Sequence, residues 1–289
     1  MTGWAPDSIP DLTGRTAIVT GANSGIGRPT ALELARHGAR VIVAARSPEK
    51  GEATVADILR AVPGAQVEYG RLDLADLASV RRFAEGVDQV DLLINNAGIG
   101  LISRRETKDG FEMQFGTNHL GHFALTGLLL PLLLAAPAAR VVNVSSDAHA
   151  AGRIDFDNLG LEHGYGRLSA YARSKLANLL FTLELQRRAE KAGTSLISVA
   201  THPGTTATNI VKLGPLQPLM GVFFKSAAAG AVSSLYAATS PDVRGGEFIG
   251  PKLQRLTPSA RARSEADARR LWEVSSELTG VRFDEIAYS

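Results

Sequence analysis

The chain has 289 residues, of which 45% are hydrophobic and 21% are charged, and its formal net charge is +2. This length is ordinary for one α/β domain, and so small a net charge gives no sign of a nucleic-acid-binding surface. Cysteine is absent, which excludes disulfides, thiolate nucleophiles and metal sites with cysteine ligands, and fits a reducing compartment.

The N-terminal segment, residues 1–12, has neither a basic start nor an apolar core, unlike a signal peptide or a membrane anchor. The longest apolar stretch, residues 124–139, is interrupted by polar residues and prolines and is shorter than the ~20 residues that span a bilayer. We therefore predict a cytoplasmic protein without a transmembrane anchor.

Short apolar segments rich in β-branched residues alternate along the chain with helical segments. The expected strands are 16–20, 40–45, 66–70, 91–95, 140–145 and 195–201, and the expected helices are 25–37, 48–61, 77–86, 110–134, 169–192 and 226–239. Segments that are apolar at nearly every position, such as 41–45, suit strands covered on both faces. The alternation predicts an α/β fold, a doubly wound parallel sheet flanked by helices on both faces.

No repeat or low-complexity tract divides the sequence, so we predict one domain over residues 1–289. Residues 205–224 combine glycine and proline with many apolar side chains, which favours either a substrate lid or an ordinary packed connection. Residues 251–289 form a C-terminal extension, in which 259–280 has the pattern of an amphipathic packing helix.

A glycine-rich turn, T-G-A-N-S-G-I-G over residues 20–27, joins the first expected strand to the first expected helix. This context is typical of a dinucleotide phosphate site. Gly21 would permit the tight turn, Gly25 would let the backbone approach a pyrophosphate, and Gly27 would let the helix pack closely. The helix N-terminus adds unpaired amide groups and a positive potential. A glycine-rich turn without a ligand is the alternative interpretation.

Arg46 follows the second expected strand, where dinucleotide folds place the residue that contacts the adenosine ribose. A carboxylate there binds the 2′-hydroxyl of NAD, whereas an arginine accommodates the 2′-phosphate of NADP. Arg46 therefore favours NADP(H), with Asn23 and Ser24 able to add hydrogen bonds. The alternative is that Arg46 only faces solvent.

Tyr171 and Lys175 lie in the sequence Y-A-R-S-K, four residues apart in an expected helix, so their side chains share one face. A free phenol has a pKa near ~10, and a neighbouring ammonium group favours the phenolate and lowers that pKa. Tyr171 could then exchange a proton near neutral pH. An exposed tyrosine beside a solvated lysine is the alternative.

Together these motifs resemble those of the short-chain dehydrogenase/reductase family over residues 12–250. Further family motifs follow in order: Asp73 in L-D-L, N-N-A-G at 95–98, Asn118 in G-T-N-H, V-V-N-V-S-S ending at Ser146, and H-P-G-T-T-A-T at 202–208. The sequences D-G-F-E-M-Q-F-G-T-N-H-L-G-H-F and Y-A-R-S-K-L-A-N are similar to the retinol dehydrogenase-like and WW-domain oxidoreductase-like branch. The resemblance implies a Rossmann-type sheet of about seven strands.

The resemblance also implies four catalytic residues, Asn118, Ser146, Tyr171 and Lys175. Tyr171 would donate or accept the proton, Lys175 would hold the nicotinamide ribose, and Ser146 would bond the substrate oxygen. Asn118 would distort its helix and hold a water that links Lys175 to solvent. The residues alone leave Ser145 as a rival to Ser146, and the resemblance selects Ser146.

Cofactor contacts are expected along the carboxyl ends of the strands, where ligands of open α/β sheets bind. The expected set is Gly21, Asn23, Ser24, Gly25, Ile26, Gly27, Arg46, Asp73, Leu74, Asn95, Ala97, Gly98, Tyr171, Lys175, Pro203, Gly204 and Thr208. By resemblance, Pro203, Gly204 and Thr208 would hold the nicotinamide carboxamide.

Three histidines, His119, His122 and His202, raise the question of a metal site. No carboxylate or cysteine stands at metal-ligand spacing from them, so no metal is predicted. The insertion between Ser146 and Tyr171 is longer than in many family members and is expected to shape a pocket wall.

The predicted function is an NADP(H)-dependent oxidoreductase that transfers hydride to or from a carbonyl or alcohol substrate with an apolar body. The alternative is a catalytically silent binding protein that senses NADP(H). The resemblance further implies a homodimer or homotetramer that pairs through the helices at 110–134 and 169–192.

Overall fold

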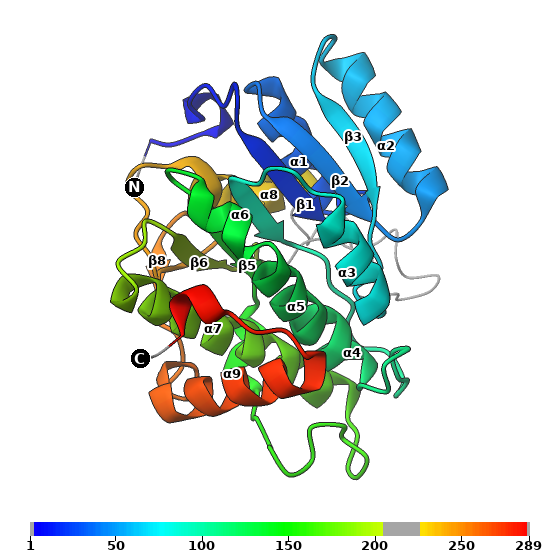
Figure 1. The fold of residues 1–289 in the computed structure, drawn as a ribbon, viewed down its shortest axis with the longest axis vertical. Helices are drawn as coiled ribbons and strands as arrows, with labels where there is room; N and C mark the ends of the chain where they lie inside the picture. The colour runs from blue at the N-terminus through cyan, green and yellow to red at the C-terminus, as the bar shows by residue number, and fades with distance from the viewer. Residues whose placement is uncertain (1–2, 205–225, 288–289) are drawn as a thin grey trace.

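Figure 1 shows the fold in a computed structural model, which describes residues 3–204 and 226–287. One eight-stranded sheet has the order β3-β2-β1-β4-β5-β6-β7-β8. The strands are β1 Thr16–Thr20, β2 Arg40–Ala45, β3 Val67–Arg71, β4 Leu92–Asn95, β5 Arg140–Val144, β6 Ile197–Thr201, β7 Phe248–Ile249 and β8 Arg255–Leu256. Neighbours pair in parallel except β7 and β8, which pair antiparallel.

Helices lie on both faces of this sheet, as predicted for a doubly wound fold (Figure 1). They are α1 Gly27–Arg36, α2 Pro48–Ala61, α3 Leu77–Glu85, α4 Met113–Phe115, α5 Gly121–Leu128, α6 Leu130–Ala135, α7 Arg167–Lys191, α8 Ala227–Thr239 and α9 Glu265–Thr279. The two-residue strands β7 and β8 were not predicted, because so short a segment has no periodicity to read. The single-domain organisation remains a prediction.

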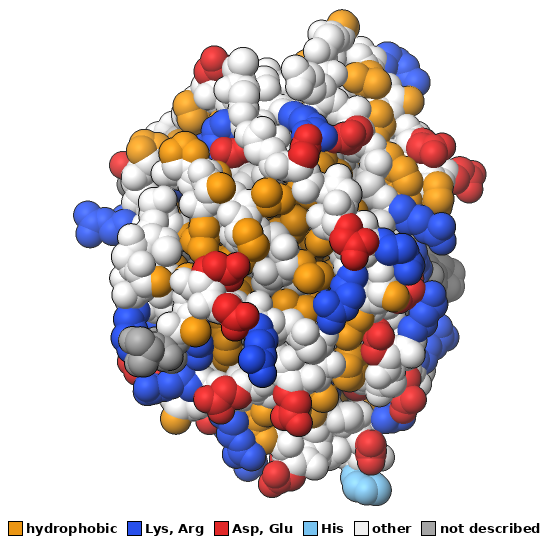
Figure 2. Space-filling view, viewed as in Figure 1, with side chains coloured by type: hydrophobic (Ala, Val, Ile, Leu, Met, Phe, Trp, Pro, Cys, Tyr) orange, Lys and Arg blue, Asp and Glu red, His pale blue; other side chains and the backbone are white. Residues whose placement is uncertain are grey.

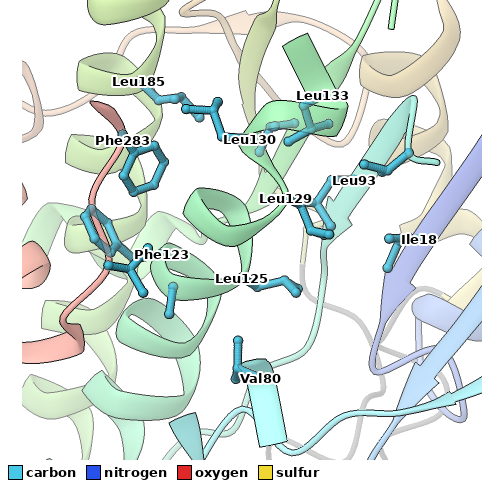
Figure 3. Packing of buried hydrophobic residues seen from close by; sticks show 14 of the residues in the cluster. Ile18, Val80, Leu93, Phe123, Leu125, Leu129, Leu130, Leu133, Leu185 and Phe283 are labelled. Carbon is cyan, nitrogen blue, oxygen red and sulfur yellow. The ribbon is translucent and has the colours of Figure 1, made fainter. Parts of the chain in front are cut away.

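Alternate residues of the central strands face opposite layers of helices. Ile18, Ile42 and Leu93 belong to a core shared with α3, α5, α6, α7 and α9. Their neighbours Val19 and Ile94 belong to a core shared with α1, α2 and α8. Figure 3 shows the first core, with Ile18 and Leu93 of the sheet facing apolar side chains of the helices. Burial on both faces explains why these strands are apolar at nearly every position.

The helix expected at 110–134 is interrupted in the structure. Residues Gly116–Leu120 form a π-helical segment between α4 and α5, and a second break separates α5 from α6. Pro131 stands in the first turn of α6, where its missing N–H group costs no helical hydrogen bond. A π-helical segment inside an α-helix often marks a functional site, and this one contains Asn118.

The C-terminal extension packs on the outer surface of α5 and α7 (Figure 1). Trp272 of α9 meets the rings of Phe123, Phe181 and Phe283, the last at a centroid distance of 4.4 Å. The guanidinium group of Arg188 lies 4.4 Å from the Trp272 ring. The predicted amphipathic helix therefore covers part of the two helices through which self-association was expected.

The surface gives two further observations. On the face shown in Figure 2, Lys and Arg side chains are interspersed with Asp and Glu, unlike the continuous basic area that nucleic acid binds. Within residues 3–204 and 226–287, none of the helices combines the length and apolar character that crossing a bilayer requires.

Candidate active site

The turn between β1 and α1 has a backbone that favours glycine. Gly21 and Gly25 have φ angles of +65° and +54°, in the left-handed region that other residues rarely adopt. At Gly27, an added Cβ would lie 2.6 Å from the Gly21 carbonyl oxygen and 2.6 Å from the Asn96 side-chain nitrogen. A larger residue at position 27 would therefore displace the turn.

The N-terminus of α1 is open to a ligand. No side chain caps it, whereas α2 and α3 are capped by Ser47 and Asp76. Near this end Ser24 is exposed and Asn23 is half-buried, while Ile26 is buried in the core. An uncapped helix end behind a left-handed glycine turn fits the pyrophosphate of a dinucleotide.

Asn96, which the sequence reasoning did not select, holds this turn against the end of β4. Its side-chain amide donates to the Thr20 carbonyl oxygen at 2.8 Å, and its backbone N–H donates to the Thr20 hydroxyl at 3.0 Å. Ala97 N–H donates to the same hydroxyl at 2.9 Å. The paired asparagines of N-N-A-G were the only signal, and they did not reveal which one faces the turn.

Asn95 and Gly98, both predicted cofactor contacts, have different surroundings. Asn95 is buried, and its amide donates to Thr126 at 3.1 Å and to Asn143 at 2.9 Å, so its side chain is engaged inside the fold. A Cβ added at Gly98 would lie 3.5 Å from the Lys175 Nζ atom. Gly98 thus brings the strand end beside the catalytic candidates.

The ends of β2 and β3 border a hollow of about 450 Å³ whose lining includes Arg46, Arg71 and Asp73. Arg46 is exposed there, as binding to a 2′-phosphate would require. Asp73 accepts the Ala75 N–H at 3.0 Å, which fixes the chain after β3. Leu74 is buried, and its backbone lies in close contact with α5.

Tyr171 and Lys175 come together on α7 beside the end of β5. The Lys175 Nζ atom is buried, lies 5.7 Å from the centroid of the Tyr171 ring, and donates to the Val144 carbonyl oxygen at 2.9 Å. Burial lowers the pKa of Lys175 to about 8. The lysine is therefore a buried ammonium at neutral pH, and the solvated-lysine alternative is wrong.

The expected lowering of the Tyr171 pKa is also wrong for this structure. Burial raises the pKa of Tyr171 above the usual phenol value, and a hydrogen bond with Ser146 offsets part of that rise. Sequence spacing revealed the neighbouring lysine but not the loss of water around the phenol. Tyr171 is consequently a neutral phenol at neutral pH.

The adjacent residues Ser145 and Ser146 have different partners. Ser145 is buried and its hydroxyl donates to the Lys175 carbonyl oxygen at 2.8 Å, which holds α7 against β5. Ser146 accepts the Ala148 N–H at 3.2 Å, and its hydroxyl lies near enough to the Tyr171 phenol to lower the pKa of that group. This geometry supports the choice of Ser146 over Ser145.

Asn118 lies in the π-helical segment and is completely buried. Its side chain accepts the Ile99 N–H at 2.9 Å, and donates to the Ile99 carbonyl at 2.8 Å and to Ser174 at 2.9 Å. Asn118 thus links a distorted helix, the loop after β4 and the Y-A-R-S-K motif. Its expected role in holding a water molecule stays a prediction.

A buried ion pair, which the sequence reasoning did not select, joins the same elements. Arg173, inside Y-A-R-S-K, lies 3.3 Å from Glu112, and both side chains are at most 2% exposed. The Glu112 carboxylate also accepts the backbone N–H groups of Gln114 and Phe115, each at 2.9 Å. The pair therefore holds the helix of Asn118 in place against α7, a long-range contact that no local pattern reveals.

The histidines have partners other than a metal ion. His119 bonds with Ser275 and His122 with Thr20, each at 2.9 Å. Burial lowers their pKa values to about 3 and about 4, so both are neutral at pH 7. His202 lies 2.8 Å from Asp147. Among the described residues, no three His, Cys, Asp or Glu side chains form a metal-binding group.

The insertion after Ser146 and the residues after β6 are expected to border the substrate, and the structure describes part of them. His149, in the insertion after Ser146, bonds the Ser146 carbonyl oxygen at 2.7 Å and accepts the Ser259 N–H at 3.2 Å. This contact connects the C-terminal extension to the catalytic serine. Pro203 and Gly204 follow β6, and Gly204 has a φ of +79°. Thr208 and the predicted lid, 205–224, lie outside the described residues.

Comparisons with known proteins agree with this geometry. A family model described as short chain dehydrogenase matches residues 15–215. Retinol dehydrogenase 12 of Mus musculus is 44% identical over 283 residues, which cover 94% of this chain and 89% of that protein. Retinol dehydrogenase 13 of Homo sapiens is 44% identical over 299 residues, which cover 97% of this chain and 89% of that protein.

Solved structures have the same fold. An uncharacterized protein from Mycobacterium paratuberculosis is 47% identical and superposes with a TM-score of 0.84 over 98% of this chain and 99% of that one. A protein of Shigella flexneri, described as a short chain dehydrogenase complexed with NADP, is 25% identical with a TM-score of 0.66 and covers 84% of this chain and 99% of that one.

Proposed function

The chain belongs to the retinol dehydrogenase-like branch of the short-chain dehydrogenase family. From this membership we propose that it transfers hydride between NADP(H) and a lipophilic alcohol or carbonyl substrate. Family membership makes the protein an oxidoreductase of alcohol and carbonyl groups. The observation that best supports catalysis is the meeting of Ser146, Tyr171 and Lys175 at one point beside Gly98.

We assign the proton transfer to Tyr171. Because burial keeps its phenol neutral, its hydroxyl holds the proton that a carbonyl oxygen needs as that oxygen gains negative charge. The Ser146 hydroxyl, which lies beside the Tyr171 phenol, would hold the substrate oxygen next to it. The dinucleotide, when bound, supplies or accepts the hydride.

Lys175 supports the phenolate that remains after the proton leaves. Its ammonium group is buried beside the Tyr171 ring, where little water screens its charge. Val144 accepts one of its three N–H donors, which leaves donors for a ribose hydroxyl. Asn118 keeps its helix distorted next to this lysine, so we assign it a supporting role in the same site.

The coenzyme contacts we propose combine the open end of α1, the glycine turn, Arg46, and the segments of Asp73 and Gly98. Arg46 supports NADP(H) over NAD(H), because its exposed guanidinium group suits a 2′-phosphate. The NADP complex of the Shigella flexneri protein is consistent with this preference. Pro203, Gly204 and Thr208 remain the proposed contacts of the nicotinamide.

The proposal that the substrate is lipophilic rests on the relatives. Proteins named retinol dehydrogenase, which are 44% identical to this chain, are named for a long apolar alcohol. The predicted lid at 205–224 would supply apolar contacts to such a substrate. Retinoid itself is one member of the class that we propose.

The test is to mix the protein with NADPH and a panel of apolar aldehydes and ketones while following NADPH absorbance. We expect oxidation of NADPH that depends on both protein and carbonyl compound, and slower turnover with NADH. Tight NADPH binding without turnover on a broad panel would instead favour the alternative function, a binding protein that senses NADP(H).

Self-association and location remain predictions. Because α9 packs on α5 and α7 within one chain, a homodimer or homotetramer formed through those helices would be built around α9. Light scattering should give two or four times the chain mass of 30.5 kDa, and the mass of one chain would contradict self-association. The proposed cytoplasmic location is tested by fractionation of the cells that express the protein.

A further inference from the structure

The hollow at the ends of β2 and β3 is lined by five cationic side chains and by the carboxylates of Glu68, Asp73 and Asp76. Five of its lining residues are Arg40, Arg46, Arg71, Arg82 and Lys108. Two of these are neutralised: Arg40 pairs with Glu68 at 2.7 Å, and Lys108 pairs with Asp76 at 2.6 Å. The hollow therefore has both satisfied and unsatisfied positive charges.

Arg46, Arg71 and Arg82 are the unsatisfied ones. All three are exposed, and none lies within ion-pair distance of a carboxylate in residues 3–204 or 226–287. A guanidinium group that no internal acid neutralises is available to an anionic ligand.

The sheet register places two of these three together. Ala45 of β2 is the direct partner of Arg71 of β3, so Arg71 ends its strand beside the residue that precedes Arg46. Both therefore stand at the carboxyl edge, where ligands of such sheets bind. Arg82 lies near the C-terminal end of α3, a helix that runs back from this edge, so it lines the opposite part of the hollow.

We infer that Arg46 and Arg71 together form the binding site of the 2′-phosphate of NADP(H), with Arg71 a specificity-determining residue of its own. A 2′-phosphate carries nearly two negative charges at neutral pH and has three acceptor oxygens, which two guanidinium groups match in charge and in geometry. Arg71 is the residue that sequence spacing did not reveal, because the adjacent strand brings it to Arg46.

This inference rests on the proposed NADP(H) preference but adds a separate residue to it. One arginine after β2 would contact the phosphate from a single side, and the remaining phosphate oxygens would be hydrogen-bonded only by water. A second arginine on the neighbouring strand doubles the charge-assisted hydrogen bonds available to the phosphate. Discrimination between the two coenzymes should therefore depend on both residues.

Isothermal titration calorimetry tests the inference without any turnover. Dissociation constants for NADPH and NADH are measured for the wild type and for Arg46→Gln, Arg71→Gln and Arg82→Gln. The Arg82 variant is the matched control, since it removes from the same hollow an arginine that is also exposed and has no ion pair among the described residues. Adenosine 5′-diphosphate with and without a 2′-phosphate serves as a second ligand pair, which isolates the phosphate from the nicotinamide.

We expect the wild type to prefer NADPH, and Arg46→Gln and Arg71→Gln each to lose about 10-fold or more of that preference by weaker NADPH binding. NADH binding should be unchanged, and Arg82→Gln should behave as the wild type. Arg71→Lys should fall between Arg71→Gln and the wild type, because it keeps the charge but not the paired donors.

Two failures have different meanings. A wild type that binds NADPH and NADH equally would overturn the proposed coenzyme preference and this inference with it. A wild type that prefers NADPH while Arg71→Gln keeps the full preference would overturn the role of Arg71 alone. Circular dichroism of Arg71→Gln checks that the fold is kept, as an exposed position allows.

Discussion

The proposed coenzyme-phosphate site and the proposed catalytic site lie at different places along the carboxyl edge of the sheet. Their charged and polar side chains differ in burial and in hydrogen bonding. The coenzyme end, with Arg46 and Arg71, has exposed charges that pair with no described carboxylate. The catalytic end, with Asn118 and Lys175, is buried and bonded to the backbone around it. Changes at the first end should alter ligand choice alone, whereas changes at the second should alter chemistry and stability together.

Tyr171→Phe should give the largest effect. The variant removes the hydroxyl that donates the proton while the ring keeps its packing, so turnover should fall by about 10²- to 10⁴-fold. NADPH affinity, measured by calorimetry, should change little because the coenzyme end is untouched. An active variant would refute the assignment of Tyr171 as the acid–base group. It would also contradict the claim that the catalytic end carries the chemistry.

Ser146→Ala and Ser145→Ala form a matched pair within the catalytic end. Ser146→Ala should lower turnover by roughly 10²-fold, since it removes a polar contact to the developing charge. Ser145→Ala should keep most turnover but lower the free energy of unfolding by about 1 kcal/mol, because its bond to the Lys175 carbonyl is lost.

Initial rates and urea unfolding of both serine variants decide between the roles. Equal losses of turnover would contradict the separate roles assigned to the two hydroxyls. A selective loss in Ser145→Ala would reverse the assignment of the two serines.

Lys175→Met should remove a distinctive pH dependence of the free energy of unfolding. The folded protein releases the Lys175 proton near pH 8 and the unfolded chain near 10.5, so between these values the unfolded state holds more protons. Stability from this group therefore rises with pH across that window, by at most about 1.4 kcal/mol per pH unit.

Urea unfolding of wild type and Lys175→Met from pH 7 to pH 10 measures this difference. The rise should be present in the wild type and absent in the variant, which has nothing to titrate at that position. Identical pH profiles would show that Lys175 is better solvated than the structure indicates. The catalytic end would then not differ from the coenzyme end in burial as described above.

The sequence predicted the regular elements well where burial imposes a pattern. The bounds of β1, β2 and α2 agree with the expected segments, because both faces of the strands are covered and Ser47 with Pro48 begins the helix. The residues of 110–134 alone predicted one unbroken helix; only the family resemblance implied a distortion at Asn118, which the π-helical segment confirms. The π-helical path of residues 116–120 depends on contacts such as that between Asn118 and Ile99.

The site was predictable as far as local spacing extends. Tyr171, Lys175 and the glycine turn were identified because each is a motif within eight residues of sequence. The roles of Asn96 and Arg71 depend on neighbouring strands, and the Glu112–Arg173 ion pair joins residues that are 61 positions apart. The direction of the Tyr171 pKa depends on burial, which spacing along one helix does not reveal.

The most direct test of the central claim is a crystal structure of the protein grown with NADPH. We predict the 2′-phosphate between Arg46 and Arg71, and the Tyr171 hydroxyl facing the nicotinamide with room for a substrate oxygen between Tyr171 and Ser146. A nicotinamide ring bound far from Tyr171 would contradict the account.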